Sequence, residues 1–324
     1  MSNFQINVAK KDILVVNKNR QFVLHRNDVG IPSGRKIEVI ETESRQLEGY
    51  PEISVIIPTA DGCRGGLFPA LLKQLSAQNF QNFETIIIKG DSRQGRAINT
   101  GADIARGRYL LTLDDDTSLA SKDAFEKLAA VIENNGTIGM AGGINVIPPD
   151  ASWFVRRAMQ EIPRRSTPPV DKITDSDLAE HPLLIIRREI FVRTGGENEL
   201  IPRGLDPYLR QEFRKAGYRV VVVPGANYSH LPPKTLFKMI KQFYRNGKQA
   251  AFCNKFYPQW VFETPGAHVK DFVERRPYLY RAARYGVNMV KKSFRGHWIY
   301  LTVSFAYAIG YMWGYMRYRD ETQA

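Results

Sequence analysis

The stretch YLLTLDDDT, residues 109–117, decides the fold, because an apolar run of strand-forming residues ends there in three adjacent carboxylates. A short apolar run bounded by polar residues predicts a buried strand in a sheet that is covered on both faces. Three acids cannot stay buried without partners, since removing each charge from water is costly. They are therefore expected at the carboxyl end of the strand, the edge where open α/β sheets bind ligands.

Two interpretations of these acids are open at this point. Clustered carboxylates suit a hard divalent cation, Mg²⁺ or Mn²⁺, and such a cation suits a substrate that carries phosphates. Alternatively, Asp115, Asp116 and Thr117 cap a helix that begins near Ser121. The local sequence does not separate a metal site from a helix cap.

Composition indicates a folded protein in a reducing compartment. The chain has 324 residues, of which 43% are hydrophobic and 24% charged, so it can bury a core in one large or two ordinary domains. Cys63 and Cys253 stand far apart without a partner motif, which predicts neither a disulfide framework nor a zinc site. The first residues lack the apolar segment of a cleaved secretion signal.

The net charge of +13 is concentrated toward the end of the chain. Residues 1–230 contain 30 Lys+Arg and 28 Asp+Glu, a net charge of +2, whereas residues 231–324 contain 16 and 5, a net charge of +11. A basic region of this kind can face nucleic acid or an anionic membrane surface.

Strands and helices are expected to alternate from residue 53 to residue 224, which is typical of a parallel α/β sheet. Strands are expected at 53–59 (breaking at Pro58), 83–88, 109–113, 138–143, 183–186 and 218–224, and helices at 67–78, 95–105, near 121–134, near 153–159, at 188–193 and up to 216. Thr59 with Asp61, Asp91, and the acids at 114–116 each follow a strand, so they should converge on one edge of the sheet. Residues 1–50 are expected to add short strands at 13–16, 21–24 and 36–40, as a small antiparallel sheet or an addition to the sheet edge.

The order of these motifs resembles the family 2 glycosyltransferases of GT-A fold, inverting enzymes that use nucleotide-sugar donors. The resemblance covers about residues 53–247, and seven elements occur in the family's order and spacing. They are SVIIPT at 54–59, GRAINTGA at 95–102 with ARG at 105–107, LDDD at 113–116 as the Asp-x-Asp motif, TGGENE at 194–199, LD at 205–206, KAGY at 215–218, and the segment from Pro224 to His230. The resemblance implies a Rossmann-like, mostly parallel sheet with helices on both faces.

The resemblance also assigns the donor site. Asp114 and Asp116 would hold the nucleotide ribose and the metal-diphosphate, with Asp115 as an alternative ligand, and His230 would contact the metal or the diphosphate. Without the motif, a loop histidine with ordinary hydrogen bonds is the simpler interpretation of His230. The nucleotide pocket would be lined by Pro58, Thr59, Asp61, Asp91, Arg96, Asn99 and Asp115, in which an Asn can read a base edge and an Arg can offset phosphate charge.

Asp206 matches the second acid of the family's Glu-Asp pair and would be the catalytic base that takes the proton from the acceptor hydroxyl. The metal would stabilise the leaving diphosphate. The simpler interpretation makes Asp206 a helix N-cap, followed by Pro207 at the first helical position. The chain departs from the family where Leu205 replaces the first acid and where KGDS at 89–92 replaces paired acids. These departures leave open which residue reads the nucleobase, and hence which nucleotide binds, but they do not affect the metal site or the catalytic base.

The C-terminal region is expected to contact a membrane surface. Residues 235–245 are amphipathic at helical spacing, which suits either an interfacial helix or a core-facing one. Gln242 and Arg245 resemble the Gln-x-x-Arg-Trp element of processive members, with Asn246 in place of Trp, and could contact the diphosphate. Residues 298–316 carry no charge and are long enough to span a bilayer, but their Tyr, Gly, Ser and Thr content and basic flanks favour a monotopic or re-entrant anchor, with 278–290 as a second amphipathic segment.

Taken together, the sequence predicts a β extension at 1–50, a GT-A catalytic domain at 51–232, and basic amphipathic helices with a membrane anchor at 233–324. The predicted activity is Mn²⁺- or Mg²⁺-dependent transfer of a sugar from a nucleotide-sugar donor to a glycan or lipid-linked acceptor, for cell-surface polysaccharide or glycoconjugate synthesis, at the cytoplasmic face of the membrane. The alternatives are a nucleotidyltransferase, a non-catalytic sugar-nucleotide-binding protein of the same fold, and a nucleic-acid-binding protein. The last is disfavoured, because no RNA-binding motif is present and the acids would repel phosphates.

Overall fold

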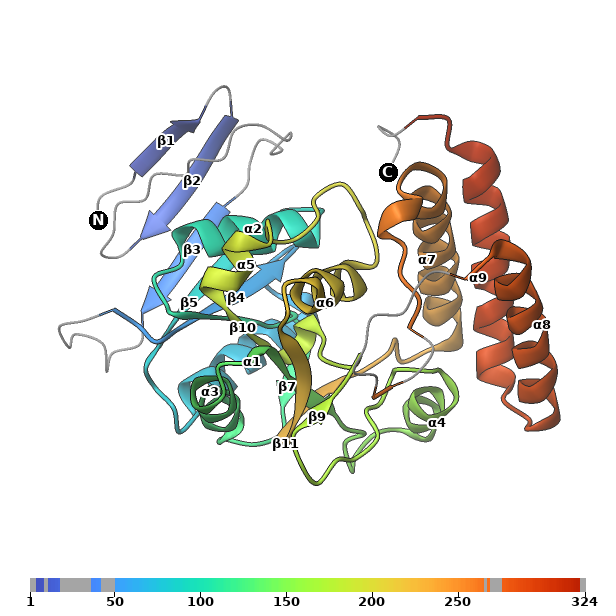
Figure 1. Ribbon diagram of the computed structural model, residues 1–324, viewed down its shortest axis with the longest axis horizontal. Helices are drawn as coiled ribbons and strands as arrows, with labels where there is room; N and C mark the ends of the chain where they lie inside the picture. The colour runs from blue at the N-terminus through green and yellow to red at the C-terminus, as the bar shows by residue number, and fades with distance from the viewer. Residues whose placement is uncertain are drawn as a thin grey trace.

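The computed structural model describes residues 4–8, 11–17, 36–41, 50–264, 267–268 and 276–320 (Figure 1). The strands are β1 (Phe4–Val8), β2 (Lys11–Asn17), β3 (Lys36–Glu41), β4 (Ile53–Thr59), β5 (Phe83–Lys89), β6 (Tyr109–Thr112), β7 (Thr117–Leu119), β8 (Ile138–Asn145), β9 (Thr174–Asp175), β10 (Leu184–Arg187) and β11 (Arg219–His230). The helices are α1 (Leu67–Ser76), α2 (Gln94–Ile104), α3 (Ala124–Asn134), α4 (Trp153–Glu161), α5 (Arg188–Arg193), α6 (Leu205–Lys215), α7 (Leu236–Phe256), α8 (Tyr278–Phe294) and α9 (Trp298–Arg317), with short 3-10 turns η2 (Arg64–Gly66), η3 (His181–Leu183) and η4 (Pro258–Trp260).

One mixed sheet runs through the molecule in the order β1-β2-β3-β5-β4-β6-β10-β8-β11-β7, and β9 pairs with β11. Strand β4 is parallel to both β5 and β6, and β8 is parallel to β11. Strand β10 lies antiparallel between β6 and β8, so the flanking strands keep a common direction. The carboxyl ends of β4, β5, β6, β8 and β11 therefore meet at one edge, as the sequence predicts, and the α/β fold class is confirmed.

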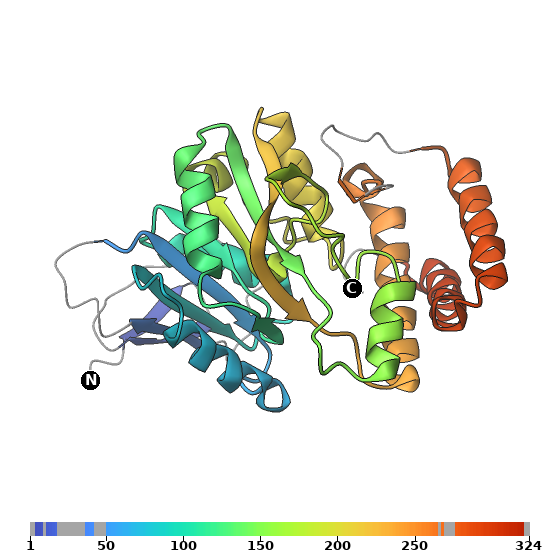
Figure 2. The same cartoon turned by 90° about the horizontal axis from the view of Figure 1, so that it is seen from below.

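Helices cover both faces of this sheet (Figures 1 and 2). Alternate residues of a strand point to opposite faces, and along β4 this places Ile56 in a core with α2, α5 and α6. Its neighbours Val55 and Ile57 belong to a second core, which includes residues of α1 and α3. Residues of β4 are buried on both sides, which explains why the sequence shows a continuous apolar run there.

The N-terminal extension adds strands to one edge of the main sheet. Strand β3 pairs antiparallel with β5, β2 pairs parallel with β3, and β1 pairs antiparallel with β2. Of the two arrangements that the sequence left open, the edge addition is therefore the correct one. The strand expected at 21–24 lies outside the described residues.

Three local predictions are wrong, each for a clear reason. Strand β4 continues through Pro58. Its last pair with β6 is Ile56 with Thr112, so β6 has no backbone group opposite Pro58 that would need the N–H that proline lacks. The residues after the three acids do not cap a helix, because β7 intervenes and α3 begins only at Ala124. His230 is not in a loop, because β11 continues to that residue.

The pairing of β7 with the end of β11 builds the site edge. Thr117 lies opposite His230, and Ser118 lies opposite Ser229. This register carries Asp116, the residue before β7, to the side of His230. A three-residue strand that the sequence did not predict thus brings together two distant motifs.

Helices α7 and α9 pack backbone against backbone through glycines. A Cβ atom at Gly247 of α7 would meet the carbonyl oxygen of Tyr307, and one at Gly310 of α9 would meet that of Tyr244. Helix α8, by contrast, buries none of its residues. Within the described part of the chain, none of the helices combines the length and the apolar character needed to cross a membrane.

We expect Gly310→Val to separate α7 from α9, because the added side chain overlaps the backbone of Tyr244. Overpacking of this kind lowers the free energy of unfolding by about 1–3 kcal/mol or more, measured by denaturant titration, with faster amide exchange along α9. Gly286→Val is the matched control, because nothing lies within 4 Å of a Cβ at Gly286 in α8. Equal stability of the two variants would contradict this packing.

Candidate active site

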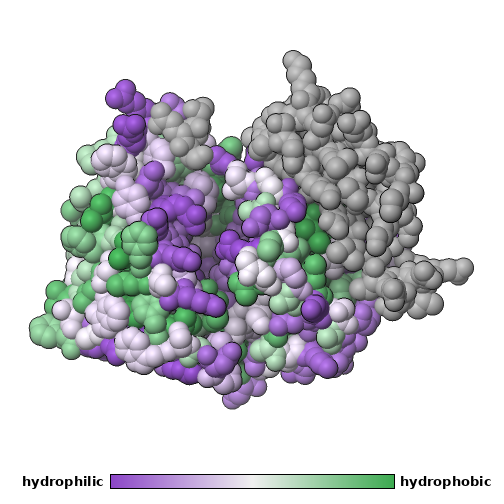
Figure 3. All heavy atoms as spheres, turned by 180° about the vertical axis from the view of Figure 1, so that it is seen from behind, coloured by the Kyte–Doolittle hydropathy of each residue, from purple (hydrophilic) through white to green (hydrophobic). Residues whose placement is uncertain are grey.

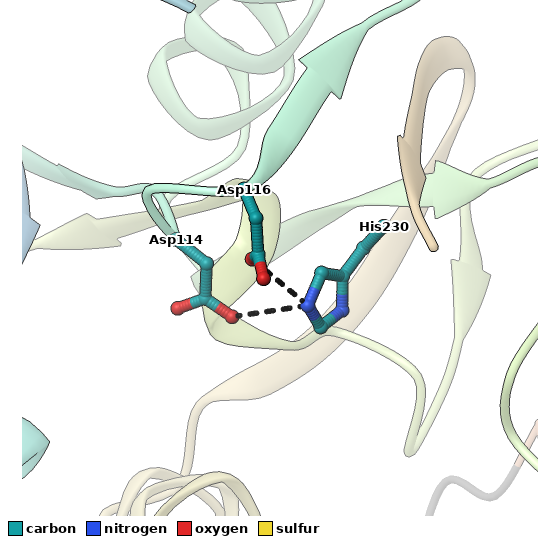
Figure 4. Close-up of side chains that lie close together, drawn as sticks. All are labelled: Asp114, Asp116 and His230. Atoms are coloured by element: carbon teal, nitrogen blue, oxygen red, sulfur yellow. Dashed lines mark ion pairs between the residues drawn. The ribbon is translucent and has the colours of Figure 1, made fainter. Parts of the chain in front are cut away.

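Two carboxylates and one imidazole meet at the sheet edge (Figure 4). Asp114 and Asp116 lie in the turn between β6 and β7, and Nε2 of His230 lies 3.1 Å from Oδ1 of Asp116 and 4.0 Å from Oδ2 of Asp114. One ligand atom from each residue lies within 4.8 Å of the others. Carboxylate oxygens with one imidazole nitrogen form a donor set that suits a divalent cation such as Mn²⁺. The cluster therefore fits the ion that the sequence predicts.

The pKa values of the three side chains depend on burial and on the charges of their neighbours. Burial raises the pKa of Asp114 to about 6, although the charge of His230 opposes this. Burial would also raise the pKa of Asp116, but the hydrogen bonds and charges of His230 and Arg64 outweigh it and lower that pKa. Burial would lower the pKa of His230, yet the two aspartates raise it. A cation that binds here has to displace the proton on His230, because a metal-bound imidazole is neutral.

Arg64 is a neighbour of the acids that the sequence analysis did not identify. Its Nη2 lies 2.6 Å from Oδ2 of Asp116, and its Nε lies 3.3 Å from Oδ1 of Asp115. The backbone N–H groups of Cys63 and Arg64 donate to Oδ1 of Asp61 at 2.8 and 2.9 Å, which shapes the loop that presents Arg64. Asp61 is thus a loop-building residue, and no motif in the sequence marks Arg64.

Asp115 and Thr59 form a tie between two strand ends. The Thr59 hydroxyl donates to Oδ2 of Asp115 at 2.7 Å and accepts the N–H of Gly62 at 3.0 Å. Asp115 is 7% exposed and does not belong to the cluster formed by Asp114, Asp116 and His230. The structure therefore gives Asp115 a structural partner in place of the alternative metal-ligand role.

Three residues predicted to line the nucleotide pocket are instead engaged inside the fold. Asp91 and Arg96 form a buried ion pair of 2.8 Å. The Asn99 amide group donates to the Glu197 carbonyl and to Oε1 of Glu199 at 2.8 Å each, and its oxygen accepts the N–H of Glu197 at 2.8 Å. In this arrangement Asn99 fastens the TGGENE segment and is not free to read a base edge.

Asp206 lies in the first turn of α6, and a buried histidine binds it. The N-cap of α6 is Gly204 with φ of 89°, so the interpretation of Asp206 as the cap is wrong. Oδ1 of Asp206 accepts the backbone N–H of His181 at 2.8 Å and lies 2.5 Å from its Nδ1. Nε2 of His181 lies 2.7 Å from Oε1 of Glu197. Glu197, His181 and Asp206 therefore form a chain, and only Asp206, with a side chain 30% exposed, reaches the solvent.

The charges in this chain keep Asp206 ionised. Burial would raise the pKa of Asp206, but the charge and hydrogen bonds of His181 outweigh it and lower the pKa well below its usual range. Burial would lower the pKa of His181, but the charges of Asp206 and Glu197 raise it well above 6.5. The two acids therefore favour the imidazolium form of His181, although burial also raises the pKa of Glu197. Nothing near His181 in the sequence marks this role, and the TGGENE motif that contains Glu197 is the one signal that points to this chain.

A cavity of about 890 Å³ joins these groups. Its lining includes Asp114 and His230 of the cluster, Asp206, and Gln242 and Arg245 of α7. Seen from behind, the molecule is hollowed in the middle of this face, where hydrophilic side chains gather (Figure 3). Of the predicted site residues, those that do not line the cavity are Pro58, Thr59, Asp61, Asp91, Arg96, Asn99, Asp115 and Asp116.

Comparison with known proteins agrees with this geometry. Residues 68–194 match the family described as Glycosyl transferase family 2. This part of the chain is therefore similar to a family 2 glycosyltransferase domain. A protein of Haemophilus influenzae described as an uncharacterized glycosyltransferase is 27% identical over 187 residues, which cover 48% of this chain and 59% of that protein.

A solved structure supports the GT-A fold. The mannosyltransferase PcManGT of Pyrobaculum calidifontis, in complex with GDP-Man and Mn²⁺, superposes with a TM-score of 0.51 at 15% identity. The superposition covers 82% of this chain and 88% of that one. The fold class expected from the resemblance is confirmed on this basis.

We expect the His181 ring to stay protonated well above pH 6.5 and its pKa to fall in Asp206→Asn, which removes the largest favourable charge. The measurement is a ¹⁵N titration of the imidazole rings by NMR. The ring of His297, whose pKa is lowered by burial and by the charge of Lys292, is the internal control and should not respond to the substitution. An unchanged His181 titration in Asp206→Asn would show that the ion pair does not form.

Proposed function

We propose that this protein transfers a sugar from a nucleotide-sugar donor to a hydroxyl group of a membrane-borne acceptor, with inversion at the anomeric carbon. The observation that carries the proposal is that one cavity joins the cluster of Asp114, Asp116 and His230 to the ionised Asp206. A group transfer of this kind needs a site for the donor diphosphate and a base for the acceptor hydroxyl. The cavity offers both.

Asp114, Asp116 and His230 would hold Mn²⁺ or Mg²⁺. A divalent cation, when bound, supplies charge that stabilises the leaving diphosphate. The presence of Mn²⁺ and GDP-Man in the Pyrobaculum mannosyltransferase supports a metal and a nucleotide sugar for this chain. Arg64, which pairs with both Asp115 and Asp116, would keep the carboxylates apart and oriented in the absence of the donor.

Asp206 would act as the base. A base must be ionised before it accepts a proton, and His181 keeps Asp206 in that form at neutral pH. Two bonds from His181 to one oxygen, Oδ1, fix the carboxylate and leave Oδ2 for the acceptor hydroxyl. Attack by that hydroxyl in a single displacement would invert the anomeric centre.

Helices α8 and α9 would lie on the membrane surface, at its cytoplasmic face. Large apolar side chains stand exposed on both helices, including Leu279 (80%), Phe294 (89%), Phe305 (65%) and Met316 (71%). Basic residues such as Lys291 and Arg295 lie beside them, and they would attract the anionic lipids of the cytoplasmic leaflet. Apolar and basic side chains together are typical of interfacial helices.

We expect Asp206→Asn to bind the donor normally and to lose at least about a hundredfold in transfer rate, because an amide cannot accept the proton. Asp116→Ala should lose donor binding in Mn²⁺, and Asp150→Ala, at an exposed position, should behave as the parent. A thermal-shift screen of UDP-, GDP- and dTDP-sugars selects the donor, and release of its nucleoside diphosphate with a lipid extract as acceptor source gives the rate. Transfer by Asp206→Asn at the parent rate would refute the assigned base.

We expect the full chain to bind vesicles that contain anionic phosphatidylglycerol more strongly than vesicles of phosphatidylcholine alone, measured by co-sedimentation. The pair Phe294→Glu and Phe305→Glu should abolish most of this binding, since both side chains point to solvent and their loss leaves the core intact. Val192→Glu is the matched control, at a side chain 64% exposed on α5. Equal binding by the double variant and the control would remove the membrane proposal.

A further inference from the structure

We propose that the acceptor is a phosphate-bearing amphiphile and that arginines of the active-site cavity bind its phosphate. This inference rests on the proposed transferase function and names the class of its acceptor. It follows from the charge of the cavity, from arginines that have no acidic partner, and from the helices that form one wall.

The cavity carries an excess of positive charge. Its lining contains seven arginines, at positions 93, 164, 165, 203, 210, 245 and 281, and only three carboxylates, those of Asp114, Glu180 and Asp206. Asp114 belongs to the cluster that fits a cation, so it does not offset the arginines when that cation is present. A cavity with this balance attracts an anionic ligand.

Some of these arginines are occupied by the fold. Arg93 donates to the backbone carbonyls of Glu199 and Leu200, Arg164 pairs with Glu180 at 2.8 Å, and Arg281 pairs with Glu263 at 3.4 Å. These three side chains are already bonded within the fold, so the proposal does not rest on them.

Three others have no acidic partner among the residues that the structure describes: Arg165, Arg203 and Arg245. Arg165 makes one weak hydrogen bond, from Nη2 to Oε1 of Gln242 at 3.4 Å. Burial and the nearby charge of Arg203 both lower the pKa of Arg165. Arg203 repels the charge of Arg165 while Glu180 and Asp116 attract it, and an anion that binds to both guanidinium groups would relieve the repulsion.

A fourth arginine is buried beside Asp206. The Arg210 side chain is 1% exposed and lines the cavity, with its Nε 3.7 Å from Oδ1 of Asp177 and its Nη1 donating to the Ala179 carbonyl. Its Nη2 has no hydrogen-bond partner in the described structure. A buried donor without a partner is costly, so such groups indicate a ligand or water that is bound in the functional state. Arg210 follows Asp206 by one helical turn, which places this donor close to the base.

The wall on the side of α7 and α9 adds aromatic side chains, which lie among polar residues of α7 such as Gln242 and Asn246. Phe243 of α7, Trp260 of η4, and Tyr300 and Tyr307 of α9 line the cavity. Helices α7 and α9 also present Phe237, Phe305 and Met312 to solvent. A ligand with an anionic head and an apolar tail fits both surfaces at once. Guanidinium groups bind phosphate oxygens with two parallel hydrogen bonds, which favours phosphate as the head.

The test measures binding of farnesyl phosphate to the full chain by calorimetry, without donor or metal and below the concentration at which the probe aggregates. Farnesol and inorganic phosphate are the two partial probes. We expect farnesyl phosphate to bind at least about tenfold more tightly than either one, because only it offers the head and the tail together. The binding should weaken as salt is added.

The variants Arg203→Gln and Arg245→Gln should each weaken farnesyl phosphate binding by roughly tenfold, the worth of one charge-assisted contact. Arg108→Gln is the matched control, because Arg108 is exposed and does not line the cavity. Phe294→Glu, which alters the surface of α8, should bind the probe as the parent does. This control separates the cavity from the membrane-facing helices.

Three results would overturn the proposal. If farnesol bound as tightly as farnesyl phosphate, the arginines would not bind the phosphate head. If inorganic phosphate bound as tightly, the cavity would not recognise the apolar tail. Variants that lose affinity for UDP or GDP with Mn²⁺, and keep it for farnesyl phosphate, would assign these arginines to the donor. Because the assay contains no donor, its outcome is independent of whether Asp206 is the base of a sugar transfer.

Discussion

Buried carboxylates at the sheet edge need positively charged partners, and this requirement connects the other parts of the structure. Parallel strands deliver polar residues to the same edge, and here the acids after β6 and the acid of α6 both arrive there. Each finds a cation from elsewhere in the chain. Asp116 has His230 and Arg64, and Asp206 has His181. These pairs hold together segments that are far apart in sequence.

The same pairs prepare the site for chemistry. The Asp206 carboxylate stays ionised because the charge and hydrogen bonds of His181 lower its pKa. Burial, by contrast, raises the pKa of Asp114 to about 6. Two aspartates that face one cavity thus differ in their proton affinity. Environments that separate the pKa values of neighbouring acids are typical of active sites. The arginines on the far wall extend this charge pattern toward α7 and α9.

The sequence predicted most of the strands, the faces they bury and the edge where the site lies, because these follow from apolar periodicity and from the direction of parallel strands. It also predicted that Asp114, Asp116 and His230 come together, through the resemblance. It did not predict β7, whose three residues are too few for a pattern, nor the partners His181 and Arg64, which only tertiary contact brings to the acids. Asn99 and Arg96 were assigned to the nucleotide because polar residues near a strand end look alike in sequence whether they bind a ligand or the fold. In the structure both side chains are buried.

Anomalous diffraction from crystals soaked in Mn²⁺ with a nucleoside diphosphate would locate the metal and the donor site directly. We expect a manganese peak within coordination distance of Asp114, Asp116 and His230, with the diphosphate in the cavity that Asp206 faces. A crystal whose diphosphate is bound while His230 and Asp116 keep their direct ion pair, with manganese absent from this cluster, would contradict this expectation.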